Sequence, residues 1–401
     1  MEKVLDWQFG IPQDSFSRLI NKMKIAVVHS FYSSRVSSGE NNVVAAQVQA
    51  LVDSGISVNL FSKMTDEMEN ESFYSFRSAL RTAVGIGINP LSEIRSFKPD
   101  ITHVHNLFPN FGFRWLPQVN SPIVSTLHNY RPICSAGILY REGQICRECI
   151  QKNSFQAVKN KCYRNSSVKT IPLAYQSRNN GSHNLLLKFS NKLIFLSQRG
   201  KSEFTEAQPQ LEKKSLVIPN FTTSLNIVRP SFEERKNWIF VGRITEEKGI
   251  EDLVRQWPDN ETLKIVGAGP LLEKLKQQAK SNIIFFGNLG HSETLEMISK
   301  SKALIFPSKW FEGMPTVYLE AISRGTPVIA SEGNSVSDDI RTSRSGLVIE
   351  GNLMNTLNLL TLNWSIYSRN ALVRFESTYS KEKWLEKTLD LYSKVIVSKT
   401  S

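Results

Sequence analysis

A regular alternation of short apolar runs with helical patterns, from Met23 onward, constrains the fold more than any other feature of the chain. The runs are rich in β-branched residues, and such alternation is typical of a parallel sheet flanked by helices. The alternation stops over the polar, irregular segment Pro219–Asn237 and then restarts. Before this segment we expect strands near Ile25–His29, Val58–Ser62, Ile101–His105, Ile123–Leu127, Leu193–Ser197 and Leu216–Ile218. After it we expect strands near Trp238–Val241, Leu263–Val266, Ile283–Phe286, Ala303–Phe306, Val328–Ala330 and Leu347–Ile349. The pattern therefore predicts an α/β protein with two doubly wound domains.

The same pattern gives the domain boundaries. We expect an extension of no assigned function, a first domain, a linker, a second domain and a C-terminal helical segment, over residues 1–22, 23–222, 223–237, 238–375 and 376–401. The last segment contains a long helical pattern, Lys381–Val397. Sheets of this kind bind ligands at the carboxyl ends of their strands, so we expect the active site in a cleft between the two domains.

Charge and composition limit the classes of partner. The 401 residues carry 49 Lys and Arg against 37 Asp and Glu, which gives a net charge of +12. This excess fits anionic partners such as nucleotide diphosphates or an anionic membrane surface. No run approaches the roughly 18 apolar residues of a membrane span, and the amino terminus lacks the apolar core of a signal peptide, so we expect a cytoplasmic protein. No nucleic-acid-binding motif is evident, so we expect no nucleic-acid partner.

The stretch Trp310–Glu320 predicts an anion-binding loop and helix. Pro315 suits the first helical position and Gly325 suits the left-handed position just past the end, so the helix should run from about Pro315 to Arg324. A helix that starts after a strand presents unbonded N–H groups, which favour an anion such as a diphosphate. The residues around this helix start are Gly313, Met314, Thr316 and Val317.

Two carboxylates, Glu312 and Glu320, lie on either side of this anion site in the sequence. A carboxylate repels a phosphate, but it is a strong acceptor for the hydroxyl groups of a sugar attached to that phosphate. Taken as an isolated pair, the two residues also fit a solvated loop acid and a surface helix acid, because most acidic residues are exposed.

The segment from Glu312 to Glu320, followed by Gly325-Thr326-Pro327-Val328, resembles the E-x7-E signature of retaining glycosyltransferases with the GT-B fold, in particular family four (glycosyl transferases group 1). The resemblance implies two Rossmann-like domains and a UDP- or GDP-sugar donor bound on the second domain. It assigns Glu312 to catalysis and Gly313, Met314, Pro315, Thr316 and Glu320 to donor binding. The last helix of such enzymes crosses back to the first domain.

Further stretches extend the resemblance through the second domain. Val241-Gly242-Arg243 and Lys248-Gly249 resemble a family stretch in which Gly242 lies at the donor and Arg243 and Lys248 hold the diphosphate. Two cations there would neutralise the charge that builds on the leaving group. A solvated basic loop is the simpler alternative. The resemblance also assigns Gly267, in a G-x-G-P turn, and Asn288, after the next strand, to donor binding.

In the first domain the resemblance assigns Gly39 to the donor phosphate and His128 to the transferred sugar. Family members carry two adjacent glycines where this chain has Ser38 and Gly39, so tight phosphate contact here is less well supported. His103 and His105, two apart in a strand, share one face. We interpret them as structural or as lining the cleft, since a third metal ligand is not evident nearby.

All four cysteines, Cys134, Cys146, Cys149 and Cys162, lie in an insert over about 130–170. In a reducing compartment stable disulfides are not expected, so a structural zinc site is one interpretation. The spacing differs from that of a standard zinc ribbon, and reduced buried thiols are the alternative.

These observations predict a hexosyltransferase that needs no cofactor for catalysis, since no Asp-x-Asp pair occupies the expected setting and Arg243 and Lys248 supply the positive charge. By the resemblance, the acceptor is a glycan or a lipid-linked acceptor, used in surface-polysaccharide biosynthesis at the inner face of the cytoplasmic membrane. Two alternatives stay open: a nucleotide-sugar epimerase of the same fold, and a non-catalytic basic module that binds membranes.

Overall fold

The computed structural model describes residues 23–33, 38–70, 72–223 and 230–400. The predicted extension, residues 1–22, and part of the predicted linker, residues 224–229, lie outside this description. By their internal contacts the residues form two compact units. The described residues of the first unit lie within 23–128, 183–194 and 385–400, and those of the second within 129–182 and 195–384.

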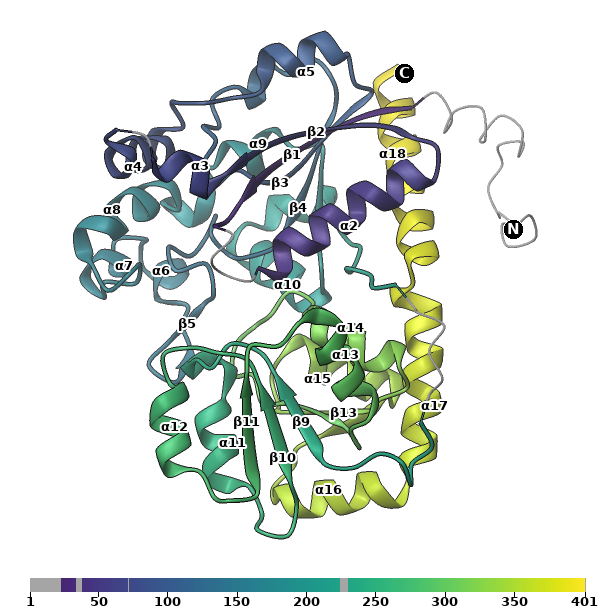
Figure 1. The fold of residues 1–401 in the computed structure, drawn as a ribbon. Coiled ribbons are helices and arrows are strands. Elements are labelled where there is room, and N and C mark those ends of the chain that lie inside the picture. The colour runs from purple at the N-terminus through teal and green to yellow at the C-terminus, as the bar shows by residue number, and fades with distance from the viewer. Residues whose placement is uncertain (1–22, 34–37, 71, 224–229, 401) are drawn as a thin grey trace. The chain divides into compact units, whose positions relative to one another are not determined.

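The first six-stranded sheet has the order β2-β1-β3-β4-β7-β8 (Figure 1). Its strands are β1 Lys24–Phe31, β2 Ser57–Met64, β3 Ile101–Asn106, β4 Ile123–Leu127, β7 Lys192–Phe195 and β8 Ser215–Val217. The pairs β1–β2, β1–β3 and β3–β4 are parallel. The strand order reverses between β1 and β3, and the carboxyl ends of strands at such a switch point are where doubly wound sheets bind ligands.

The first unit covers this sheet with short helices. They are α2 Gly39–Asp53, α3 Thr65–Glu69, α4 Tyr74–Val84, α5 Leu91–Phe97, η1 Leu116–Gln118 and α9 Leu185–Phe189. One core cluster joins Val28 of β1 and Val104 of β3 to Ile94 of α5. These β strands are buried on both faces, as expected of a sheet between helix layers.

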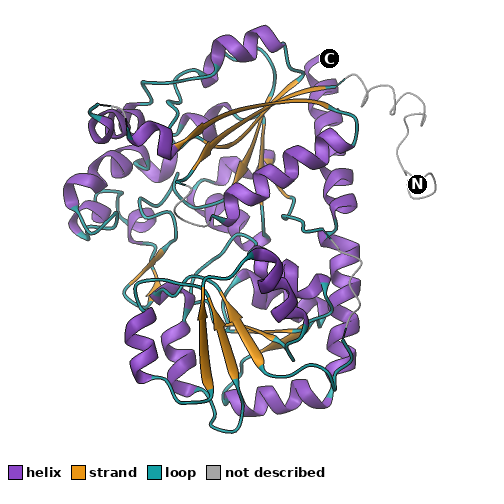
Figure 2. Cartoon of the chain, in the orientation of Figure 1, coloured by secondary structure: helices purple, strands orange, loops and turns teal. Residues whose placement is uncertain are grey.

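The second sheet has the order β11-β10-β9-β12-β13-β14, and all of its strand pairs are parallel (Figure 2). Its strands are β9 Trp238–Val241, β10 Leu263–Val266, β11 Ile283–Gly287, β12 Leu304–Phe306, β13 Val328–Ala330 and β14 Gly346–Val348. This is the Rossmann order, and the switch point lies between β9 and β12. The predicted strands are therefore found in both sheets, and the predicted fold class is confirmed.

Strand β9 shows how the sequence builds two cores on one sheet. Successive side chains point to opposite faces, and Trp238 and Phe240 join one buried cluster while Ile239 joins the other. The first cluster contains α11 and α16 residues, and the second contains α14, α15 and α17 residues.

The helices of this part are η4 Glu246–Lys248, α11 Ile250–Gln256, α12 Leu272–Gln278, α13 His291–Ser299, α14 Thr316–Ser323, α15 Ser335–Ser343, α16 Leu353–Leu362, α17 Trp364–Arg374 and the π-helical turn η5 Phe375–Tyr379.

The long last helix, α18 Lys381–Thr400, is found where a helical pattern was expected. Its residues from Leu385 onward have their contacts in the first unit. There the hydroxyl of Tyr392 lies 2.6 Å from Nδ1 of His103 on β3.

Helix α14 starts one residue later than the sequence predicted. Pro315 was expected at the first helical position, but it is the cap residue, with ψ of 132°, and the helix begins at Thr316. The backbone N–H of Tyr318 donates to the Pro315 carbonyl at 3.2 Å, so this carbonyl accepts a hydrogen bond from the first turn although Pro315 itself is not helical. The predicted end is confirmed, because Gly325 has φ of +64°, the left-handed conformation that suits glycine.

The second unit also contains the cysteine-bearing insert, Asn129–Ser182. It consists of the hairpin β5 Tyr140–Arg141 and β6 Gln144–Ile145 and the short helices α6 Glu148–Gln151, α7 Gln156–Lys159, α8 Ser167–Gln176 and η2 Asn179–Gly181. It is followed by α10 Gln198–Ala207 and η3 Pro209–Lys214. Among the residues that the structure describes, no helix is both long enough and apolar enough to cross a membrane.

Candidate functional site

The predicted donor-site residues of the second unit lie after the carboxyl ends of neighbouring strands. Gly242, Arg243 and Lys248 follow β9, and Glu312 follows β12. The fold therefore places these residues at the switch point of a Rossmann-like sheet, where ligands of this architecture bind.

An ion pair joins the loops at this switch point. Nζ of Lys248 lies 2.8 Å from Oε1 of Glu312, and the side chains are 16% and 8% exposed. The Ser308 hydroxyl donates to the same carboxylate oxygen at 2.7 Å. A buried carboxylate is costly unless it is paired and hydrogen-bonded, and Lys248 and Ser308 meet that requirement. The lysine also lies over the ring of Trp310, 5.7 Å from its centroid.

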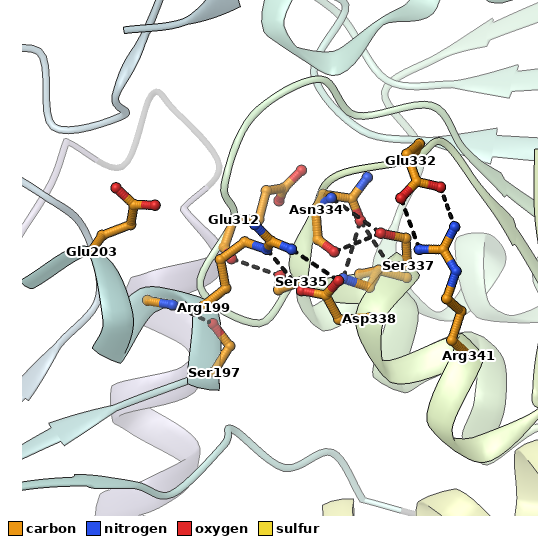
Figure 3. A network of polar contacts seen from close by, with 12 residues as sticks. Ser197, Arg199, Glu203, Glu312, Glu332, Asn334, Ser335, Ser337, Asp338 and Arg341 are labelled. Atoms are coloured by element: carbon orange, nitrogen blue, oxygen red, sulfur yellow. Dashed lines mark hydrogen bonds and ion pairs between the residues drawn. The ribbon is translucent and has the colours of Figure 1, made fainter. Parts of the chain in front are cut away.

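The Glu312 loop is held in place by polar side chains on its backbone. Ser335 donates to the Glu312 carbonyl at 2.7 Å, and Asn334 donates to the Ser308 carbonyl at 2.9 Å. The side chain of Asn334 also caps α15 (Figure 3). From the other side, Asn220 donates to the Met314 carbonyl at 3.2 Å. These bonds fix the loop conformation independently of any ligand.

Aromatic and basic groups continue the site beside Glu312. The ring of Phe311 lies 5.1 Å from the Arg199 guanidinium and 5.7 Å from that of Arg147, which belongs to the insert. Arg199 makes two hydrogen bonds to the Asp338 carboxylate, at 2.7 and 2.9 Å (Figure 3). Arg147 pairs with the buried Glu203. The insert thus contacts the loop that carries Glu312.

Arg243 differs from Lys248 in its surroundings. Its side chain is 56% exposed, and its guanidinium donates to Glu247 at 3.0 Å. Glu247 also accepts from the Thr245 hydroxyl at 2.7 Å. An exposed pair of this kind contributes little to stability, so Arg243 can exchange its partner for a bound anion at low cost.

Two glycines are required by the close approach of these loops. A Cβ on Gly267, whose φ is +132°, would lie 1.9 Å from the Gly242 carbonyl oxygen. A Cβ on Gly249, whose φ is +68°, would lie 2.0 Å from the Pro307 oxygen. These two glycines therefore let the loops after β9, β10 and β12 meet at one edge of the sheet. Gly267 thus has a packing role, in addition to the donor-binding role that the sequence resemblance predicts for it.

Glu320 points to a separate part of the site. Its carboxylate lies 3.0 Å from Nε2 of His291, the first residue of α13. The Glu320 side chain is 13% exposed and that of His291 is 71% exposed. Asn288 follows β11 and is exposed. The structure thus separates the two acids of the motif: Glu312 is held by a lysine and Glu320 by a histidine.

In the first unit, the partly buried His128 ends a row of histidines in which His103 and His105 are buried. Its Nε2 lies 3.0 Å from Nδ1 of His105, whose ring stacks on that of His103 at 4.2 Å. Nε2 of His103 lies 2.8 Å from the Thr126 hydroxyl. Burial lowers the pKa of His29 to about 4 and those of His103 and His128 to about 3, so these rings are neutral at physiological pH.

The switch point of the first sheet holds a polar cluster near Gly39. Asn106, which ends β3, donates to the Glu40 carboxylate at 2.8 Å and to the Tyr32 hydroxyl at 2.9 Å. Gly39 is the first residue of α2, and Ser38 caps that helix by accepting from the Asn41 N–H at 3.3 Å. Ser38, which replaces a family glycine, thus has a capping role.

The four cysteines, Cys134, Cys146, Cys149 and Cys162, line one pocket of the insert. None of them is in a disulfide. Burial first, and then the neighbouring Cys134 and Cys162, raise the pKa of Cys149 to about 12. Within the described part of the chain, no group of three or more His, Cys, Asp or Glu side chains already has the geometry to hold a metal ion.

Several groups at the site were not singled out from the sequence. Two buried donors there, Trp310 Nε1 and the Tyr130 hydroxyl, have no hydrogen-bond partner among the described residues. Tyr130 is close enough to Glu203 and Arg199 for their charges to act on its hydroxyl. Buried donors without partners are rare and call for an explanation. The sequence offered one signal for each of these donors: Trp310 lies two residues before Glu312, and Tyr130 lies two residues after His128.

The chain is similar to several known proteins. Residues 225–364 match the family described as Glycosyl transferases group 1. The chain is 24% identical over 281 residues to a glycogen synthase of Mycobacterium tuberculosis, covering 66% of this chain and 59% of that protein. It is 24% identical over 250 residues to an uncharacterized 42.6 kDa protein in the cps region of Klebsiella pneumoniae, covering 61% of this chain and 60% of that protein. The chain thus spans about three fifths of the length of these curated relatives.

Solved structures resemble the whole fold. Sucrose-phosphate synthase from Thermosynechococcus elongatus has a TM-score of 0.66 at 16% identity, covering 94% of this chain and 100% of that one. Anabaena HepE in complex with UDP-glucose has a TM-score of 0.59 at 14% identity, covering 93% of this chain and 100% of that one. With the two parallel sheets, these likenesses establish the GT-B fold of two Rossmann-like domains. The Lys248–Glu312 pair lies within residues 225–364, the region that matches the family described as Glycosyl transferases group 1.

Proposed function

We propose that the protein is a retaining glycosyltransferase that moves a hexose from a nucleotide-diphosphate sugar to a glycan or lipid-linked acceptor. The observation that carries this proposal is the buried Lys248–Glu312 pair at the switch point of the second sheet, inside the matched region. The E-x7-E resemblance supports retention and assignment to family four. The structural neighbour HepE was solved with UDP-glucose, which supports a UDP-sugar among the donor candidates.

The proposed chemistry is electrostatic. When the glycosidic bond breaks, negative charge grows on the departing diphosphate, and preorganised cations in a partly dry site stabilise it. Lys248 is held at that position by Glu312 and Trp310, whereas Arg243 is exposed and can swing toward a phosphate. The N–H groups of Thr316 and Val317 at the start of α14 cannot bond within the helix and add donors for the anion.

Glu312 has two successive roles in this proposal. Without a ligand its carboxylate neutralises Lys248. When a diphosphate takes over part of the lysine charge, the carboxylate becomes available to accept hydrogen bonds from sugar hydroxyls and to favour a developing positive centre. Glu320, deeper along α14, is proposed to hold the ribose, with His291 as its partner in the absence of nucleotide.

In the first unit, His128 is proposed to contact the transferred sugar. Burial keeps the ring neutral, so it can act as a hydrogen-bond donor or acceptor without adding charge beside the reacting carbon. The leaving phosphate is proposed to help deprotonate the acceptor, as the family resemblance implies. Because Arg243 and Lys248 supply the positive charge, transfer should proceed with no divalent metal added.

We further propose that the protein acts in surface-polysaccharide biosynthesis, in the cytoplasm and at the inner face of the membrane. The relative in the Klebsiella cps region supports the pathway class. The net charge of +12 supports peripheral attachment to anionic lipid. Helix α4 and the residue before it add an exposed apolar stripe, with Phe73, Phe76 and Leu80 exposed by 80%, 70% and 40%. Aromatic residues on an amphipathic helix suit insertion into the headgroup region.

The test is a binding and turnover screen. Purified protein is titrated by calorimetry with UDP, GDP and ADP, and then incubated with the corresponding sugar nucleotides, without Mg²⁺ or Mn²⁺. We expect one nucleoside diphosphate to bind more tightly than the others, and its sugar nucleotide to be consumed slowly even without acceptor. Failure of all three to bind would count against the proposal.

A further inference from the structure

The insert brings together all four cysteines of the chain, although 11 residues separate Cys134 from Cys146 and 12 separate Cys149 from Cys162. Their side chains line one pocket within the second unit. Four thiols gathered in so small a segment are not needed to fill a core, since the remaining lining already includes Leu139, Ile150 and Ala157.

The backbone presents each thiol from a tight turn. Cys146 follows the β5–β6 hairpin, and its N–H donates to the Leu139 carbonyl at 2.8 Å. Cys149 lies in the four-residue helix α6, one turn further on. The N–H of Cys134 donates to the Tyr130 carbonyl at 2.8 Å, and that of Cys162 to the Ala157 carbonyl at 3.0 Å. A C-x-x-C unit that passes from a hairpin into a helical turn, with two flanking cysteines, matches the ligand set of a structural tetrathiolate site.

The insert also has unusual backbone conformations next to these ligands. Leu139, whose carbonyl holds Cys146, has φ of 49°, and Lys161, which precedes Cys162, has φ of 51°. Bulky residues in this left-handed region are strained, and such strain persists where surrounding interactions enforce it. The short helices of the insert, of four residues each in α6 and α7, supply few such interactions.

The charge around the pocket fits a metal thiolate. A divalent ion with four thiolates carries a net charge of −2, and the pocket lining contributes two guanidinium groups, Arg141 and Arg147. Both also pair with carboxylates outside the lining, Arg141 with Glu142 and Glu148 and Arg147 with Glu203, so they offset that charge only in part. Arg141 and Cys146 line the same pocket. Donors to the sulfur atoms and nearby cations stabilise such a site.

We propose that Cys134, Cys146, Cys149 and Cys162 bind one structural zinc ion that orders the insert. Zinc takes four thiolates in tetrahedral geometry, at roughly 2.3 Å from each sulfur. Because the thiols line the pocket without yet having ligand geometry, binding requires rotation of their side chains about χ1 and deprotonation of the thiols. In a reducing compartment, zinc binding and not disulfide formation is the expected fate of such a cluster.

The proposed zinc site bears on the donor loops, a consequence that rests on the proposed function. Arg147, inside the C-x-x-C unit, lies over Phe311 next to Glu312. Tyr140 of the hairpin has its hydroxyl 3.5 Å from the Glu246 carboxylate, in the loop between Arg243 and Lys248. An insert ordered by zinc therefore supports both loops that carry the Lys248–Glu312 pair.

The experiment measures zinc in the full chain, expressed with zinc and purified without chelators. We expect about one zinc ion per chain, released stoichiometrically as a mercurial reagent titrates the four thiols. Cys146→Ser and Cys149→Ser should each lose the ion, while Lys152→Ala, an exposed substitution in the same insert, should retain it. Cobalt substitution should give the intense visible absorption of a tetrahedral thiolate site.

Three outcomes would overturn the proposal: a zinc content near zero, four thiols that react equally fast with and without zinc, or a disulfide between any two cysteines. The mercurial titration uses the unaltered chain, so it remains decisive if a cysteine variant fails to fold. Nucleotide binding is measured separately, so a zinc-containing protein that binds no nucleotide would contradict the proposed function and leave the metal site intact.

Discussion

Replacing Lys248 with methionine should cost both stability and activity, because the lysine is the charged partner of a buried carboxylate. Glu312 is 6% exposed and its remaining side-chain partner is the neutral Ser308 hydroxyl. Removing one member of a buried ion pair leaves an uncompensated charge and typically costs about 3–5 kcal/mol. The partial exposure of Lys248, 16% for its side chain, lets water reach the cavity, so we expect about 2–3 kcal/mol.

The expected magnitude can be measured by a double-mutant cycle. Lys248→Met and Glu312→Gln are compared singly and together, by chemical denaturation of the full chain. Each single variant should be destabilised, and the double variant should be more stable than the sum of the single effects predicts, by about 1–3 kcal/mol. Lys309→Met removes a lysine of the same loop that pairs with Asp252, both side chains being 33% exposed. It provides the control and should change stability by less than about 1 kcal/mol.

The same variants report on catalysis. Turnover should fall by roughly a hundredfold or more in each single variant, the scale for losing one preorganised charge. The double variant should recover stability without recovering turnover, because the charge that meets the diphosphate is still missing. Strictly additive effects on stability would refute the coupling, and a double variant with normal turnover would refute the catalytic role.

Four further predictions follow from other parts of the structure. Arg243→Ala should lower turnover by roughly a hundredfold with unchanged melting temperature, since the side chain is 56% exposed; a large loss of stability would contradict this. Glu320→Gln should weaken nucleoside diphosphate binding, measured by calorimetry, more than it lowers turnover at saturating donor; the opposite balance would refute the ribose assignment. Burial lowers the pKa of His103 from 6.5 to about 3, so on acidification the unfolded chain takes up a proton before the folded chain does. The free energy of unfolding should therefore fall as the pH drops from about 6.5 toward 3, by about 1.4 kcal/mol per pH unit for this group. His103→Gln should reduce that slope, which melting curves between pH 7 and about 4 would show. Phe76→Ser should reduce sedimentation with anionic vesicles, and high salt should release the unaltered protein; equal binding to neutral vesicles would exclude the electrostatic attachment.

The sequence predicted the fold well because its signals were local. Each strand of the two large sheets is a short apolar run bounded by polar or glycine residues, as in Leu263–Val266, so periodicity alone identified it. The hairpin Tyr140–Ile145 was not predicted, because its two-residue strands are too short to show alternation. The start of α14 was placed one residue early because proline suits both the cap and the first helical position, and it is the extended backbone of Pro315, with ψ of 132°, that makes it the cap.

The site was predicted in part, for a similar reason. Motif residues that follow strands, such as Arg243, Lys248 and Glu312, were located by the strands themselves. Their partners were not, because pairing depends on side chains distant in sequence: Lys248 is 64 residues from Glu312. His291 opposite Glu320, and Arg199 beside Phe311, carry no local motif at all. The convergence of four cysteines on one pocket likewise depends on turns that composition does not specify.

We propose that the switch point of the second sheet binds the diphosphate of a sugar donor through Lys248. Calorimetry of the preferred nucleoside diphosphate against the unaltered protein and Lys248→Met tests it most directly, with the melting temperature of each sample recorded alongside. The account predicts a single site in the unaltered protein and at least tenfold weaker binding in the variant, since about 1.4 kcal/mol of binding free energy corresponds to that factor. Equal affinity of a folded Lys248→Met variant would contradict it.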